Sequence, residues 1–236
     1  MDVIDTILII IFIFLNLTCF ILSTYTMNEV LDSLGNWFVM LTHLLVIPSI
    51  FLVYKTRWYL SVLLFSLTSS IIFHLSKLGY IGDENDYERW DVASQNVLIT
   101  STFFLLVYKN IPEWAFLYTA ASGILMAALG ELRLGSFQVF EYVSAIIFFL
   151  LFLYLILRIW RPIKIRDNKY IFLAFMCSVI AGISFIVAEY SAEDSYALIH
   201  SIWHCSAYVM LYFSLKSIKN PYQQLIQYRR ERDFSS

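Results

Sequence analysis

The chain has 236 residues, of which 60% are hydrophobic and only 14% are charged, and its formal net charge is −2. A typical soluble domain has about 25% charged residues and roughly 45–50% apolar residues. The composition therefore excludes a soluble globular protein and predicts an integral membrane protein. The net charge is close to zero and does not identify a binding partner. Without an excess of basic residues, we expect no nucleic-acid partner.

Apolar segments close to 20 residues long predict membrane-spanning helices, because about 20 helical residues cross the hydrocarbon core of a bilayer. Eight such segments follow one another, so the predicted fold class is all-α, a polytopic membrane helix bundle with seven or eight spans. Their approximate bounds are 4–24, 37–55, 57–80, 89–108, 111–130, 135–160, 169–190 and 195–216.

The first segment is either an additional span or a signal peptide. The preceding sequence Met1-Asp2-Val3-Ile4-Asp5 lacks the basic residues that introduce a signal peptide, and no clear small-residue cleavage site follows. We therefore predict a retained eighth span, with a cleaved signal as the alternative. Both readings place the C-terminus on the same side of the membrane.

Basic residues predict the orientation, because cytoplasmic loops of membrane proteins are enriched in Lys and Arg. Of the 16 basic residues, all but Lys77, Arg89 and Arg133 fall on the side that carries the C-terminal tail. The sequence thus predicts a cytoplasmic C-terminus. Acidic residues dominate the loops on the opposite side.

Two histidines in the last segment predict a metal site. His200 and His204 are four residues apart, which places them on one helix face with Cβ atoms about 6 Å apart. His74 lies about 26 Å along the segment that begins at residue 57, at 1.5 Å per residue. With the predicted orientation, all three lie in the outer, non-cytoplasmic third of the membrane. Three neutral imidazoles and one open position are a usual catalytic zinc site.

Other polar residues fall at the same depth. Ser70 precedes His74 by one helical turn and shares its face, and Asp91 lies at the outer end of the segment 89–108. We expect His43 to be an interhelical hydrogen-bond donor. Glu141, near mid-bilayer, either lines a cavity or is protonated and structural. A proton-coupled transporter that uses His43 and Glu141 is disfavoured, because the sequence has no inverted repeat.

The motifs Ser70-Ile71-Ile72-Phe73-His74, Asp91 and His200-Ser201-Ile202-Trp203-His204 resemble the S-x3-H, D and H-x3-H signature of the CREST superfamily. That superfamily includes alkaline ceramidases, progestin and adiponectin receptors, and the myomaker and GPI-phospholipase branch. The resemblance implies a seven-helix core over 37–216. Residues 1–36 are then an N-terminal helix and loop, and residues 217–236 a cytoplasmic tail.

The branch within the superfamily stays open. Arg57-Trp58-Tyr59 and His200-Ser201-x-x-His204-Cys205 are most similar to the myomaker and GPI-phospholipase branch. Ser70-x-x-Phe73-His74 and Trp203-His204 are also similar to the ceramidases. Leu75-Ser76 stands where the myomaker branch has Cys-Asp, and the loop after it lacks that branch's cysteines.

The resemblance implies a zinc-dependent hydrolase that cleaves an amide or ester bond of a membrane lipid from the non-cytoplasmic leaflet. In this interpretation His74, His200 and His204 bind zinc. Asp91 orients or deprotonates water, and Ser70 hydrogen-bonds the water or the developing oxyanion. The alternative is a non-catalytic receptor or membrane-remodelling protein with a structural zinc site. Both kinds of member carry these residues, so the two functions stay open at this point.

Overall fold

The computed structural model describes residues 3–23, 29–54, 57–82, 84–107, 167–189 and 193–218, with a few further positions between 146 and 157. The predicted helix 111–130, most of the predicted helix 135–160, Glu141 and the tail beyond residue 218 lie outside the described residues. The helices are α1 (Val3–Ser23), α2 (Glu29–Thr42), the 3₁₀ helix η1 (His43–Val46), α3 (Ile47–Val53), α4 (Arg57–Lys77), α5 (Glu84–Val107), α8 (Asn168–Glu189) and α9 (Glu193–Ser217). The described part contains no β-strand, which confirms the all-α class there.

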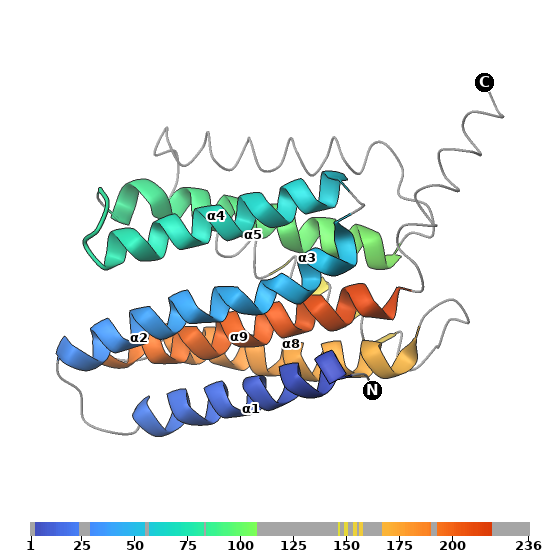
Figure 1. Cartoon of the computed structure of the whole chain (residues 1–236), viewed down its shortest axis with the longest axis horizontal. Helices are drawn as coiled ribbons and strands as arrows, with labels where there is room; N and C mark the ends of the chain where they lie inside the picture. Colours follow the sequence, from blue (N-terminus) through green and yellow to red (C-terminus); the bar gives the residue numbers. More distant parts are fainter. Residues whose placement is uncertain are drawn as a thin grey trace.

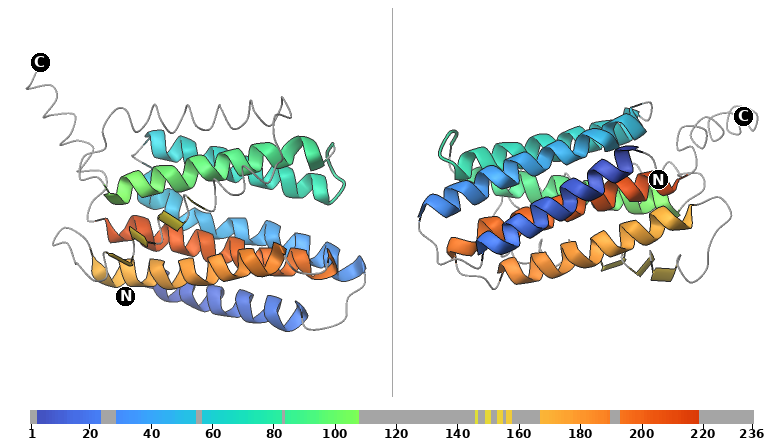
Figure 2. Two further views of the ribbon diagram at one scale, coloured as in Figure 1. Left: turned by 180° about the vertical axis from the view of Figure 1, so that it is seen from behind. Right: turned by 60° about the horizontal axis from the view of Figure 1, so that its bottom comes forward.

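The helices form a bundle in which their axes follow a common direction (Figures 1 and 2). Helix α9 packs against α8, α2, α1, η1, α3 and α5, while α4 packs mainly against α5. Most of the other described helices therefore pack against α9. Its side chains lie in the interior of the described bundle.

The surface and the interior have the polarity expected of a membrane protein. Large apolar side chains such as Phe14, Phe51 and Phe172 are exposed, whereas Ser, Thr, Asn, Asp and His side chains are buried. Polar groups in membrane helices face the protein interior because lipid offers them no hydrogen-bond partner. The exposed apolar side chains are thus suited to face lipid.

Three segments of the described chain are long and apolar enough to cross a membrane: Leu34–Val53, Trp58–Lys77 and Asn168–Ala188. Helix α1 contains a shorter apolar stretch, Val3–Thr18. These helices indicate a multi-pass membrane protein. Helices α5 and α9 are less apolar because they carry many of the buried polar residues, which include Asp91, Ser94, Asn96, Ser101, His200, His204 and Ser214.

The predicted helix 37–55 differs from the structure in two respects. The helix begins earlier, at Glu29, and it is interrupted by η1 at His43. Pro48 lies in the first turn of α3 and has no N–H to donate to the Leu44 carbonyl. The Ile47 N–H bonds that carbonyl instead, which tightens the chain into a 3₁₀ turn. A hydropathy pattern does not reveal this change, since both helical forms are apolar.

Helices α2 and α9 approach each other closely at Gly35. A Cβ atom on Gly35 would lie only 2.8 Å from the Cβ of Ala197. The Ser201 hydroxyl donates to the Gly35 carbonyl, at 3.2 Å, and to the carbonyl of Ala197, at 2.8 Å. Small residues allow such backbone approach between membrane helices. This contact joins the middle of α2 to the first turns of α9.

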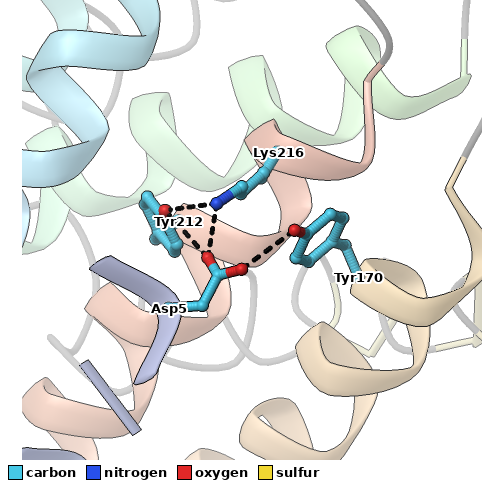
Figure 3. Close-up of polar contacts among 4 residues, drawn as sticks. All are labelled: Asp5, Tyr170, Tyr212 and Lys216. Atoms are coloured by element: carbon cyan, nitrogen blue, oxygen red, sulfur yellow. Dashed lines mark hydrogen bonds and ion pairs between the residues drawn. The ribbon is translucent and has the colours of Figure 1, made fainter. Parts of the chain in front are cut away.

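Helix α1 is attached to α8 and α9 by a buried carboxylate (Figure 3). Asp5 is fully buried and accepts hydrogen bonds from the hydroxyl of Tyr170, at 2.9 Å, and the hydroxyl of Tyr212, at 3.1 Å. The Lys216 ammonium forms an ion pair with the same carboxylate. Further along α1, Asn16 Nδ2 lies 3.8 Å from Cys205 Sγ of α9. Polar contacts therefore fix α1 along much of its length.

We expect Asp5→Ala to destabilise the protein, because it leaves the Lys216 ammonium without its carboxylate. Removing one partner of a buried ion pair typically costs about 3–5 kcal/mol, and the partial exposure of Lys216 places the expected loss near the lower value. Asp5→Ala combined with Lys216→Met should be less destabilised than Asp5→Ala alone. Chemical denaturation in detergent micelles measures these differences.

Lys169→Met is the matched control for this prediction. Lys169 is exposed and its ammonium lies over the ring of Tyr170, 5.9 Å from the centroid. Exposed substitutions usually change stability by no more than about 0.5 kcal/mol. A loss for Asp5→Ala no larger than that of Lys169→Met would contradict the anchoring role of Asp5.

Candidate metal centre

Three histidines from two helices meet in the interior, and we refer to His74, His200 and His204 as the three-histidine cluster. His74 lies in the last turn of α4, and the other two lie on one face of α9. Their exposed fractions are only 1%, 9% and 2%. One ring nitrogen from each lies within 4.8 Å of the other two. The structure thus brings together the three residues that the sequence analysis selected as ligands.

The distances from His204 to the other two ring nitrogens are close to those around a small tetrahedral cation. His204 Nε2 lies 3.3 Å from His74 Nε2 and 3.0 Å from His200 Nε2. Nitrogen ligands about 2.0–2.1 Å from a tetrahedral zinc ion lie about 3.3–3.4 Å from one another. The donor set also fits, because neutral imidazole is the commonest metal ligand.

Hydrogen bonds between the rings explain the positions of these nitrogens less well than a bound cation does. The Nε2 atom of a neutral imidazole carries either one hydrogen or one lone pair in the ring plane. His204 Nε2 therefore cannot form two regular hydrogen bonds, one to His74 and one to His200, in ideal geometry. A cation that receives all three lone pairs accounts for their convergence better than ring-to-ring hydrogen bonds do.

A tight connection between α4 and α5 lets the two helices pack against each other, with Asp91 of α5 beside Ser70 of α4. Helix α4 ends in a Schellman motif, in which Tyr80 N–H bonds the Leu75 carbonyl at 3.0 Å and Gly79 N–H bonds the Ser76 carbonyl at 2.9 Å. Gly79 has the positive φ of 75° that this motif requires. Helix α5 then starts at Glu84, earlier than the predicted residue 89, because acidic residues are favourable in a first helical turn.

Asp91 and Ser70 lie together beside the cluster. The Asp91 side chain is 3% exposed, and its Oδ2 accepts a hydrogen bond from Gln95 Nε2 at 2.8 Å. The Ser70 hydroxyl is close to the Asp91 carboxyl and to the hydroxyl of Tyr208. These approaches lack regular hydrogen-bond geometry, and within the described chain Ser70 Oγ and Asp91 Oδ1 have no regular partner. Both groups are therefore available to a bound molecule.

His43 and Tyr208 also belong to these surroundings. The His43 ring centroid lies 5.2 Å from that of His204 and 5.5 Å from that of Tyr208. The expectation of a hydrogen bond from His43 to another span is wrong for Nδ1, which donates to the carbonyl of Val39, four residues earlier at the end of α2, at 2.8 Å. Tyr208 follows His204 by one turn on α9, so helical periodicity alone indicates its position.

All five residues that the sequence analysis assigned to the site, His74, His200, His204, Asp91 and Ser70, are buried and lie in this region of the bundle. Their chemical roles remain predictions. His43 was not assigned to the site, since its lateral position depends on the packing of α2 against α9.

Comparison with known proteins gives one result. No curated protein and no solved structure matches the chain. Residues 34–205 match a family described as protein of unknown function (DUF3522). The matched range begins in α2, ends just after His204, and includes His43, Ser70 and Asp91. Because it covers more than half of the chain, the protein belongs to the DUF3522 family.

Proposed function

We propose that the protein is a zinc-dependent integral-membrane hydrolase that cleaves an amide or ester bond of a lipid. The observation that carries this proposal is the convergence of three buried imidazole nitrogens, at 3.0 and 3.3 Å. Ser70 and Asp91 lie near Tyr208, whose ring centroid is 5.8 Å from that of His204. The resemblance of the three histidines, Ser70 and Asp91 to the CREST signature supports the same function. The family match from residue 34 to residue 205 also supports a core that excludes α1.

The proposed fold is a seven-helix core over residues 37–216, preceded by the additional span 1–36 and followed by a cytoplasmic tail from residue 217. This count includes the predicted helices 111–130 and 135–160. In the proposed orientation α4 runs outward, and α2 and α9 run inward. His74 then lies at the outer end of α4, and the centre faces the non-cytoplasmic leaflet.

Zinc bound by His74, His200 and His204 would supply an activated water molecule near neutral pH and would polarise a carbonyl group. Asp91 is the proton acceptor, because its Oδ1 has no regular hydrogen-bond partner among the described residues while Gln95 holds Oδ2 at 2.8 Å. It takes the proton of the attacking water and returns it to the leaving group. Ser70 Oγ donates a hydrogen bond to the oxygen on which negative charge develops.

A lipid substrate fits the location of these residues. The cluster and Asp91 are enclosed by helices, and their exposed fractions do not exceed 9%. The outer surfaces of those helices present large apolar side chains. A substrate that is itself dissolved in the bilayer reaches the centre by passing between helices, without crossing an aqueous surface. No partner other than a membrane lipid is needed for this reaction.

The deep burial of the cluster also favours a second candidate function. A closed zinc site braces helices without catalysis, as in a receptor or a membrane-remodelling protein. In that case the zinc would join α4 to α9, which have few other contacts with each other among the described helices. Asp91 Oδ1 and Ser70 Oγ, which have no regular hydrogen-bond partner among the described residues, favour the hydrolase. A structural zinc site would not require these two groups.

The metal site predicts close to one zinc ion per chain in purified protein. His200→Ala combined with His204→Ala should remove the zinc, since one imidazole cannot retain it. Elemental analysis by mass spectrometry measures the content. Ser206→Ala is the matched control, because Ser206 lies on the same helix, is fully buried and has no hydrogen-bond partner within the described chain. Equal zinc content in the double variant and this control would eliminate the site.

The base role predicts that Asp91→Asn lowers hydrolysis by about 10²- to 10⁴-fold, the usual contribution of a general base, while zinc is retained. Lipids of cells with and without the intact His200 and His204 pair identify the substrate for this assay. The matched control is Ser94→Ala, because the Ser94 hydroxyl donates to the backbone carbonyl of Asp91, at 2.8 Å, and not to its carboxylate. Full activity of Asp91→Asn would exclude the general-base role.

The orientation predicts that a protease-sensitive tag placed after Ser236 is cleaved only when the cytoplasmic face is accessible. The reason is the enrichment of Lys and Arg on that side. Digestion of sealed cells, compared with digestion of permeabilised cells, measures this accessibility. Cleavage of the tag in sealed cells would refute the orientation.

A further inference from the structure

His43 lies beside the three-histidine cluster without belonging to it. Its ring centroid is 5.2 Å from that of His204 and 5.8 Å from that of His74. The rings of His74 and His204 are 5.1 Å apart, so His43 is almost as close to each as they are to one another. Its nitrogens are nevertheless outside the group of ligand atoms that lie within 4.8 Å. His43 therefore faces the cluster as a neighbour.

The hydrogen bond of Nδ1 defines the chemical character of the other nitrogen. Nδ1 lies 2.8 Å from the Val39 carbonyl oxygen, which only accepts, so Nδ1 carries the hydrogen. In the neutral ring Nε2 is then a hydrogen-bond acceptor. This atom is buried and has no partner among the residues that the structure describes. Buried acceptors without partners are rare and costly, so this one requires an explanation.

The backbone around His43 holds the ring in this orientation. His43 is the first residue of η1, directly after the end of α2. The Thr42 hydroxyl donates to the same Val39 carbonyl, at 2.6 Å, through a bond that is separate from that of His43 Nδ1. Both Thr42 and His43 are buried, with exposed fractions of 1% and 4%. The acceptor Nε2 is thus presented to the interior from a fixed position.

We propose that His43 is a specificity-determining residue of the centre. Its Nε2 accepts a hydrogen bond from a molecule bound at the position that the three histidines leave open. The centre therefore favours ligands that carry an N–H group next to their metal-binding oxygens. This inference rests on the proposed function, because it requires a metal ion in the cluster.

Two simpler roles fit the geometry less well. A residue that only joins helices would pair Nε2 with a neighbouring helix, and Nε2 has no such partner in the described chain. A fourth metal ligand would place a nitrogen within the group formed by His74, His200 and His204, and His43 does not. An acceptor for a bound molecule accounts for both the position and the unpaired nitrogen.

Binding of two matched probes to the cobalt-substituted, full-length protein in detergent micelles tests the inference. Acetohydroxamate and N-methylacetohydroxamate offer the same two oxygens to a metal, but only the first has an N–H group. The visible spectrum of the cobalt reports the affinity of each. The wild type should prefer acetohydroxamate by about 10-fold, the value of one hydrogen bond of typical net strength. His43→Phe should lose this preference.

Two further variants separate the role of the ring from that of its surroundings. Thr42→Val removes the other hydrogen bond to the Val39 carbonyl and leaves His43 in place, so it should keep the preference. His43→Gln retains an acceptor, so it should keep part of the preference, and it also serves if His43→Phe does not fold. The cobalt content of each variant is measured in parallel.

The outcomes are distinguishable. If the wild type binds no cobalt, both the proposed function and the role of His43 are overturned. If cobalt binds but His43→Phe keeps the preference, or the wild type has none, only the role of His43 is overturned. Loss of cobalt from His43→Phe and not from Thr42→Val would make His43 a metal ligand, and would also overturn the acceptor role.

Discussion

A polar side chain inside a bilayer has no water to pair with, so it must find its partners within the protein. This constraint acts most strongly on α9, which carries His200 and His204 toward one end and Tyr212 and Lys216 toward the other. Helices α1, α2, α5 and α8 all pack against α9 and enclose both groups. The central position of α9 thus follows from its polar content, and the other helices are arranged by their contacts with it.

Two local backbone features then bring further polar groups to α9. The Schellman motif at Gly79 ends α4 shortly after His74 and lets α5 begin almost immediately, and Asp91 of α5 lies beside Ser70 of α4. The 3₁₀ turn before Pro48 ends α2 at His43, whose ring centroid lies 5.2 Å from that of His204. The second feature is a 3₁₀ stretch within an otherwise helical segment, and such stretches often mark functional hinges or strained sequences.

The sequence predicts those parts of the centre that depend on helical geometry alone. The spacing of His200 and His204 fixes their shared face, and the constant rise per residue gives the depth of His74. The contacts of His43 and Asp5 were not predicted, because they depend on which helices are neighbours and how each is rotated. Membrane helices are apolar on both their lipid-facing and their inward-facing sides, so hydropathy does not distinguish these rotations. Asp5 and its partner Lys216 are also separated by almost the entire chain.

The two polar groups on α9 differ in how completely their hydrogen-bond donors and acceptors are paired, and this difference bears on the function that we propose. The Asp5 carboxylate accepts hydrogen bonds from the hydroxyls of Tyr170 and Tyr212 and forms an ion pair with Lys216. Its charge is therefore balanced, and both of its oxygens have a partner. Around the three-histidine cluster, Asp91 Oδ1 and His43 Nε2 have no regular partner among the described residues. Native proteins retain few such buried groups, because each costs free energy of folding. The surroundings of the cluster therefore carry a stability cost that the Asp5 site does not, and the cation and ligand that we propose to bind there would offset that cost.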